Sequence, residues 1–126
     1  MFKKNETFSS FSVSDLKKTK EFYEKKLSLK TDENNGLLNL HITDNSSVMI
    51  YPKPNHSPAS FTVLNFKSDN IDKSVEELNQ QGIKCIIYNE SNIKTDEKGI
   101  LRDDYMNIAW FKDPAGNILS VIEEKK

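Results

Sequence analysis

The sequence predicts an α+β fold in which two βαβββ modules pack mixed, curved sheets around a cup and leave their helices outside. Three observations lead to this prediction. Strand-like alternation and helix-like spacing of apolar residues follow one another in the same order twice. The segment PKPNHSPAS, too rich in Pro and Ser for regular structure, separates the two occurrences. Each half has a single helix to cover its sheet, so the other face of each sheet needs a second sheet.

The first module is predicted to begin with a strand at residues 8–13, where Phe11 and Val13 share one face and serines the other. Asp15 is a good helix N-cap, and apolar residues from Leu16 to Leu27 recur at helical spacing for about three turns. Three strands follow at residues 27–32, 37–43 and 48–53, joined by turns at ENNG and DNSS. The first half therefore has the order βαβββ.

The second module repeats this order. A strand at 61–68 precedes a helix at 69–82 that ends at Gly82, and the apolar run IKCIIY predicts a strand at 83–88. A long polar loop then extends from Asn89 to about Asp104, before strands at 105–111 and 117–123 that flank the turn KDPAG. We expect one domain over residues 1–126, with modules at about 7–53 and 61–124 and a linker at 54–60.

Composition excludes several classes of function. The chain has 36% hydrophobic and 29% charged residues and a formal charge of −1, so neither nucleic acid nor an anionic membrane is an expected partner. The apolar runs are too short to span a bilayer, and the first residues lack the apolar core of a signal peptide, so we expect a cytoplasmic protein. Cys85, the only cysteine, has no partner for an internal disulfide.

The segments FSVSDLKKTKEFYEKKLSLKT and FKDPAGNILSVIE, together with the repeated βαβββ order, resemble the glyoxalase, bleomycin-resistance and extradiol-dioxygenase superfamily, the vicinal oxygen chelate fold. The resemblance covers about Phe8 to Glu123. It implies a fold and leaves the reaction open, because members include isomerases, lyases, transferases, dioxygenases and drug-binding proteins. In the metal enzymes of this family, His and carboxylate ligands hold a divalent cation at positions that here carry Phe8, Val63 and Ser120. We therefore expect no metal, no cofactor and no catalytic residue of the usual kind.

Alternation along the strands predicts which side chains line the cup. With Phe8, Val63 and Ser120 pointing inward, a period of two sends further residues to the same face. The expected lining is apolar and aromatic with a few hydroxyl and amide groups, as is usual for a small-molecule site; the alternative is ordinary sheet core or a dimer interface. The predicted ligand-binding residues on the strands are Phe8, Ser12, Met49, Tyr51, Phe61, Val63, Asn65, Trp110 and Ser120.

Three further residues complete the predicted site. His41 alternates with Leu40 and Ile42 and either contacts a ligand or is an ordinary hydrogen-bonded histidine. The polar loop could close over the cup and bring Arg102, the only arginine, and Tyr105 to a ligand, or it could have no such role. His56, in the linker, is expected to be a solvated loop residue.

The leading hypothesis is a homodimeric small-molecule-binding member of the superfamily that holds or sequesters a drug or metabolite without metal chemistry. An alternative is a glyoxalase-like lyase or isomerase with a non-standard metal site, for example His41 with Asp103 or Asp104. A third is a structural or regulatory dimer whose cup is filled by its own side chains. Whether the modules pair within one chain or are exchanged between subunits stays open.

Overall fold

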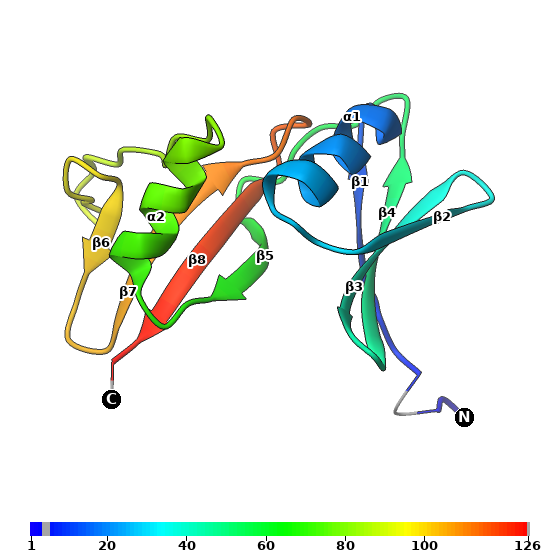
Figure 1. Ribbon diagram of the computed structural model, residues 1–126, viewed down its shortest axis with the longest axis horizontal. Coiled ribbons are helices and arrows are strands. Elements are labelled where there is room, and N and C mark those ends of the chain that lie inside the picture. The colour runs from blue at the N-terminus through cyan, green and yellow to red at the C-terminus, as the bar shows by residue number, and fades with distance from the viewer. Residues whose placement is uncertain (4–5, 126) are drawn as a thin grey trace. The chain divides into compact units, whose positions relative to one another are not determined.

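The computed structural model describes residues 1–3 and 6–125 and divides the chain into two compact units, Met1–Pro58 and Ala59–Lys126 (Figure 1). Each unit contains one four-stranded sheet and one helical segment in the order βαβββ. The α+β class and the repeated βαβββ order are therefore confirmed.

The first unit consists of β1 (Ser9–Val13), α1 (Leu16–Glu21), the π-helical segment η1 (Phe22–Lys26), β2 (Thr31–Asn34), β3 (Leu37–Thr43) and β4 (Ser46–Pro52). Its strands are ordered β1-β4-β3-β2, with β1 parallel to β4 and the other pairs antiparallel. Asp15 caps α1 by accepting a hydrogen bond from the Lys18 amide at 3.1 Å, as the sequence predicts. The predicted strand at 27–32 begins later, because η1 extends to Lys26 and Ser28 then takes a left-handed φ of 58°.

The second unit consists of β5 (Thr62–Lys67), α2 (Ile71–Gln80), β6 (Ile100–Arg102), β7 (Met106–Lys112) and β8 (Ile118–Glu124). The strand order is β5-β8-β7-β6, with β5 parallel to β8 and the other pairs antiparallel, so it repeats the arrangement of the first unit. Asn70 caps α2 by accepting from the Lys73 amide, and Gly82 follows the helix with a φ of 78°.

The prediction of a strand at residues 83–88 is wrong, and β6 lies inside the segment predicted as loop. The edge of β7 that a third strand can use is taken by Ile100–Arg102, which pairs with Asn107, Ile108 and Ala109. Residues 83–88 are joined to β7 by the hydrogen bond from the Ile86 amide to the Trp110 carbonyl oxygen, at 2.7 Å, without forming a strand. An apolar run predicts burial, but which of two segments forms the ladder depends on long-range pairing.

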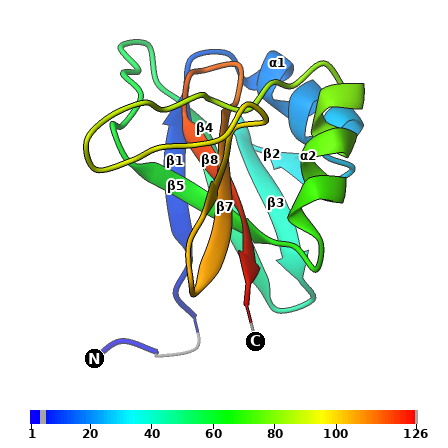
Figure 2. The same cartoon turned by 90° about the vertical axis from the view of Figure 1, so that its left-hand side faces the viewer.

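One face of each sheet packs on the helix of its own unit, α1 on β3 and β4 and α2 on β7 and β8. Figure 2 shows α2 along one side of the strands of the second unit. We call this the helix face and the opposite side the open face. The helix faces contain the buried apolar residues of the sheets, namely Phe11, Val13, Leu38, Leu40, Val48 and Ile50 in the first unit and Ile100, Ala109, Phe111, Leu119 and Val121 in the second.

Among the residues that the structure describes, no helix is both long enough and apolar enough to cross a membrane.

Candidate functional site

Three predicted site residues form one row across the open face of the second unit. Trp110 of β7 pairs with Ser120 of β8, and Ser120 pairs with Asn65 of β5. Ser120 is only 1% exposed, and its Oγ donates a hydrogen bond to Asn65 Oδ1 at 2.5 Å. A buried hydroxyl is thereby satisfied by a side chain that itself remains exposed.

The surroundings of this row are apolar. Ile108, Ile118 and Ile122 lie on the same face by register and are half-buried, as is Trp110. The Tyr88 ring meets the Trp110 ring edge to face, with centroids 5.4 Å apart and an interplanar angle of 87°. Sequence reasoning missed Tyr88 as a site residue, although its place at the end of the apolar run IKCIIY was a usable signal.

The predicted alternation of Phe61, Val63 and Asn65 is broken at the start of β5. Thr62 pairs with Ile118 and Leu64 with Leu119, so the register shifts between them and Val63 is the extra residue of a bulge. Phe61 precedes β5 and has an exposed side chain. Only Asn65 of the three therefore shares its row with Ser120 and Trp110.

In the first unit, Ser12, Met49 and Tyr51 lie on the open face. The pairing of β1 with β4 joins Ser12 to Tyr51 and Ser10 to Met49, out of phase with the buried residues Phe11 and Ile50. Ser12 Oγ and His56 Nδ1 are hydrogen-bonded at 2.7 Å. The solvated loop histidine expected at position 56 is thus a half-buried partner of β1, which local sequence could not show because 44 residues separate the two.

His41 pairs with Asp32, through Nε2 and Oδ2, on the neighbouring strand β2. Sequence reasoning missed Asp32 and considered Asp103 or Asp104 as the acidic partner of His41. Asp103 instead accepts from the Tyr105 and Met106 amides at 2.7 and 2.8 Å, and these hydrogen bonds hold the pKa of its carboxyl below the ordinary value. Tyr105 is exposed in the turn between β6 and β7.

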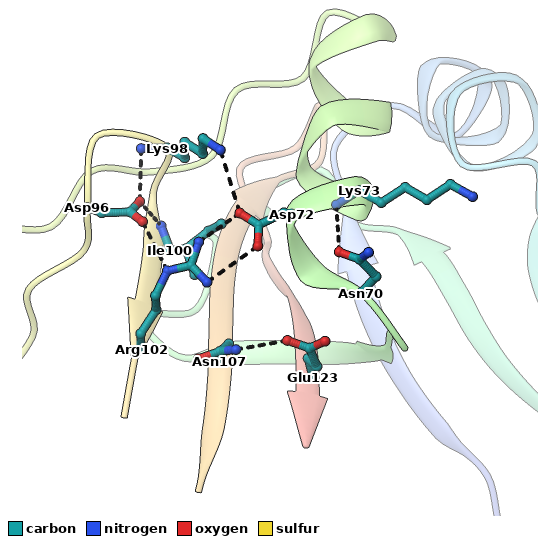
Figure 3. Close-up of polar contacts among 9 residues, drawn as sticks. All are labelled: Asn70, Asp72, Lys73, Asp96, Lys98, Ile100, Arg102, Asn107 and Glu123. Carbon is teal, nitrogen blue, oxygen red and sulfur yellow. Dashed lines mark hydrogen bonds and ion pairs between the residues drawn. The ribbon is translucent and has the colours of Figure 1, made fainter. Parts of the chain in front are cut away.

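Arg102 lies on the helix face of the second unit, because it pairs with the buried Asn107. Its guanidinium donates to Asp72 of α2, with Nη2 2.7 Å from Oδ1, and to Asp96, with Nε 3.3 Å from Oδ2 (Figure 3). Lys98 Nζ is also 3.6 Å from Asp72 Oδ1. The predicted lid residue Arg102 therefore joins β6, α2 and the preceding loop on the side opposite Trp110.

These ion pairs shift the ionisation of the acidic groups. The hydrogen bond from Arg102 is the largest of the effects that lower the pKa of Asp72. Burial works against ionisation of Asp96, yet the amides of Ile100 and Lys98 and the Arg102 side chain leave its pKa below the ordinary value. In the same region, burial raises the pKa of the Cys85 thiol to about 11, so that thiol stays protonated near neutral pH.

The positions at which the family resemblance places metal ligands do not offer a matching donor set. The Phe8 side chain is 63% exposed and, like that of Val63, has no donor atom, while the Ser120 hydroxyl is used by Asn65. Within residues 1–3 and 6–125, no three or more His, Cys, Asp or Glu side chains are gathered where they could hold a metal ion.

The model of the Glyoxalase/Bleomycin resistance protein/Dioxygenase superfamily matches residues 8–121. Among solved structures, the chain is similar to the glyoxalase family protein from Enterococcus faecalis, with 23% identity and a TM-score of 0.71 over 98% of this chain and 100% of that one. TnmS3, an antibiotic binding protein from Streptomyces sp. CB03234, has 20% identity and a TM-score of 0.69 over 94% of this chain and 96% of that one.

A third similar structure is the fosfomycin resistance protein FosX from Mesorhizobium loti, with 12% identity and a TM-score of 0.67 over 98% of this chain and 95% of that one. None of the curated proteins matches the chain. The structural similarities show the shared fold, and the family match extends over most of the sequence. The resemblance seen in the sequence is confirmed: the chain belongs to the Glyoxalase/Bleomycin resistance protein/Dioxygenase superfamily.

Proposed function

We propose that this protein binds a small, partly apolar molecule, a drug or a metabolite, on the open face of its second unit and without a chelated metal ion. The observation that carries the proposal is the row of Trp110, Ser120 and Asn65, an aromatic ring and an amide set among half-buried isoleucines. Small-molecule sites commonly combine an apolar lining with a few placed polar groups. The antibiotic binding of TnmS3 and the fosfomycin resistance of FosX support a ligand of drug-like size.

The metal-free part of the proposal rests on donor chemistry. A divalent cation in this family needs imidazole or carboxylate ligands, and Phe8, Val63 and Ser120 supply neither. The glyoxalase-like alternative is favoured by one observation, the pair of His41 and Asp32, which brings an imidazole and a carboxylate together. Two such donors are fewer than the three protein ligands of ordinary catalytic zinc sites.

Trp110 is the only tryptophan, so its indole N–H gives a single resonance in a ¹H–¹⁵N spectrum and reports directly on the proposed site. We would titrate the protein with bleomycin, fosfomycin and a panel of aromatic metabolites. We expect at least one compound to move the Trp110 signal saturably and to raise the melting temperature. The variant Asn79→Ala, on the exposed side of α2, should respond like the parent protein. If no compound in the panel moves the signal, the binding proposal fails.

Metal analysis distinguishes the two candidate functions. After dialysis, the binding proposal predicts no stoichiometric Ni, Zn, Mn or Fe in the purified protein. Metal that survives dialysis and is lost in His41→Ala would instead establish the glyoxalase-like alternative.

We also propose that the protein is a homodimer, as the family resemblance implies. Light scattering on the eluted peak of a gel-filtration column measures the molar mass. A monomer at micromolar concentration would contradict this part of the proposal.

A further inference from the structure

The hydrogen bond between Ser120 and Asn65 sets the orientation of the Asn65 amide. Ser120 Oγ donates to Oδ1, so the oxygen of the amide faces β8 and the Nδ2 hydrogens point away from that bond. Asn65 is exposed, and in the part of the chain that the structure describes no other group is hydrogen-bonded to its side chain. Two oriented N–H donors are thereby presented at the margin of an apolar face.

The spacing of the sheet relates this donor to Trp110. Asn65 and Trp110 lie in one row on β5 and β7, with β8 between them, so their backbones are roughly 10 Å apart. Ser120, in the middle of the row, is too small and too buried to contact a ligand with its hydroxyl. A molecule that uses both neighbours must present a flat apolar part to the indole and a hydrogen-bond acceptor to the amide.

We infer that the ligand is an aromatic compound with a carbonyl group attached to its ring, and that Asn65 Nδ2 donates a hydrogen bond to the oxygen of that group. Ser120 is the positioning residue, because its hydroxyl holds Oδ1 and so keeps the donors of Asn65 toward the ligand. This inference rests on the proposed function and names the ligand class of the same site. The ligand must present a hydrogen-bond acceptor here, because a donor group of the ligand would face the N–H donors of the Asn65 amide.

Acetophenone and ethylbenzene are matched probes, since both have one benzene ring and a two-carbon substituent and only acetophenone has a carbonyl oxygen. Their affinities are measured from the Trp110 indole signal, and the Asn65 side-chain NH₂ signals are followed in the same spectra. We expect acetophenone to bind about fivefold more tightly, the usual effect of one neutral hydrogen bond. It should also shift the Asn65 signals, whereas ethylbenzene should not.

Variants separate the donor from the residue that orients it. Asn65→Asp keeps the shape but removes both N–H donors, so the fivefold preference for acetophenone should disappear. Ser120→Ala should reduce the preference, because the amide can then rotate, and Ser120→Thr should restore it by returning a hydroxyl. Asn79→Asp is the matched control, because it makes the same substitution at an exposed asparagine of the same unit. Each variant is compared by its ¹H–¹⁵N spectrum to show that it folds.

The outcomes distinguish this inference from the proposed function. Equal affinity for the two probes, or an unchanged preference in Asn65→Asp, overturns the inference and leaves the binding proposal standing if other compounds still move the Trp110 signal. Failure of both probes to bind at millimolar concentration, while an antibiotic or metabolite binds, also overturns it. If no compound moves the signal, the proposed function and the inference fail together.

Discussion

The two faces of the second unit's sheet use different chemistry. On the helix face, the exposed rim is charged, with Arg102 bound to Asp72 and Asp96, and the centre is apolar core. On the open face, half-buried apolar side chains surround the uncharged pair of Ser120 and Asn65. The charged residues of the helix-face rim connect β6, α2 and the loop before β6. On the open face the charged residues Lys67, Lys112 and Glu124 lie toward the strand ends, so its uncharged centre is the part suited to a ligand.

The largest expected effect compares two neighbours in β7 that face opposite ways. Phe111 is 1% exposed on the helix face and stacks on Phe66, with ring centroids 6.5 Å apart. Phe111→Ala should therefore lower the free energy of unfolding by about 3–5 kcal/mol. Trp110 is half-buried on the open face, and Trp110→Ala should cost about 1–2 kcal/mol while it abolishes ligand binding. Urea denaturation followed by circular dichroism measures both losses. Similar losses would show that the open face is ordinary core.

The next largest effect is expected at Gly99, which lies against Cys85 in the segment 83–88 beside β7. Gly99 has a φ of 85°, and a Cβ there would lie 2.7 Å from the Cys85 Cβ atom. Gly99→Ala should lower the free energy of unfolding by about 1–3 kcal/mol and shift the fluorescence of Trp110, whose carbonyl accepts from Ile86.

Gly82→Ala is the matched control for this prediction, because Gly82 has a similar φ of 78° and no atom within 4 Å of the added Cβ. The control should show only the cost of the left-handed backbone, about 1 kcal/mol, and unchanged fluorescence. Equal losses in the two variants would mean that the contact of Gly99 with Cys85 is unimportant.

A smaller effect is expected for the charged rim. The Arg102 side chain is 42% exposed, so Arg102→Met should lower the free energy of unfolding at pH 7 by at most about 1 kcal/mol. Arg102→Lys should recover only part of this loss, since the ammonium keeps the charge but lacks the planar set of donors with which the guanidinium reaches both Asp72 and Asp96. Ligand affinity should stay within about twofold of the parent, because Arg102 lies on the opposite face. A large loss of ligand affinity would indicate that Arg102 belongs to the ligand site, and would contradict its placement on the opposite face.

The smallest effect is a dependence on pH. The pKa values of Asp72 and Asp96 are lowered below 3.8 in the folded protein, so the unfolded chain binds protons more readily. Their contribution to stability is therefore present above about pH 4–5 and is lost as the pH falls through the folded-state values. The difference in stability between the parent and Arg102→Met should shrink over that range. A difference that stays constant from pH 7 down to pH 2.5 would contradict this linkage.

The sequence by itself determined the parts of the protein that depend on local periodicity. Alternation located β3, β7 and β8, the N-cap Asp15 located the start of α1, and the repeated order of elements led to the family. Hydrophobic periodicity and helix capping depend on residues that are close together in the sequence, so both can be recognised without knowledge of the fold.

Only the tertiary structure decided which residues meet. Competition for the edge of β7 made Ile100–Arg102 the strand and left residues 83–88 beside it. The bulge at Val63, the partners Asp32 of His41 and His56 of Ser12, and the turn of Arg102 toward α2 all depend on pairing between strands or segments distant in sequence. Such pairings depend on the register between strands and on which segment pairs with a strand's free edge, and neither is encoded in a short window of residues.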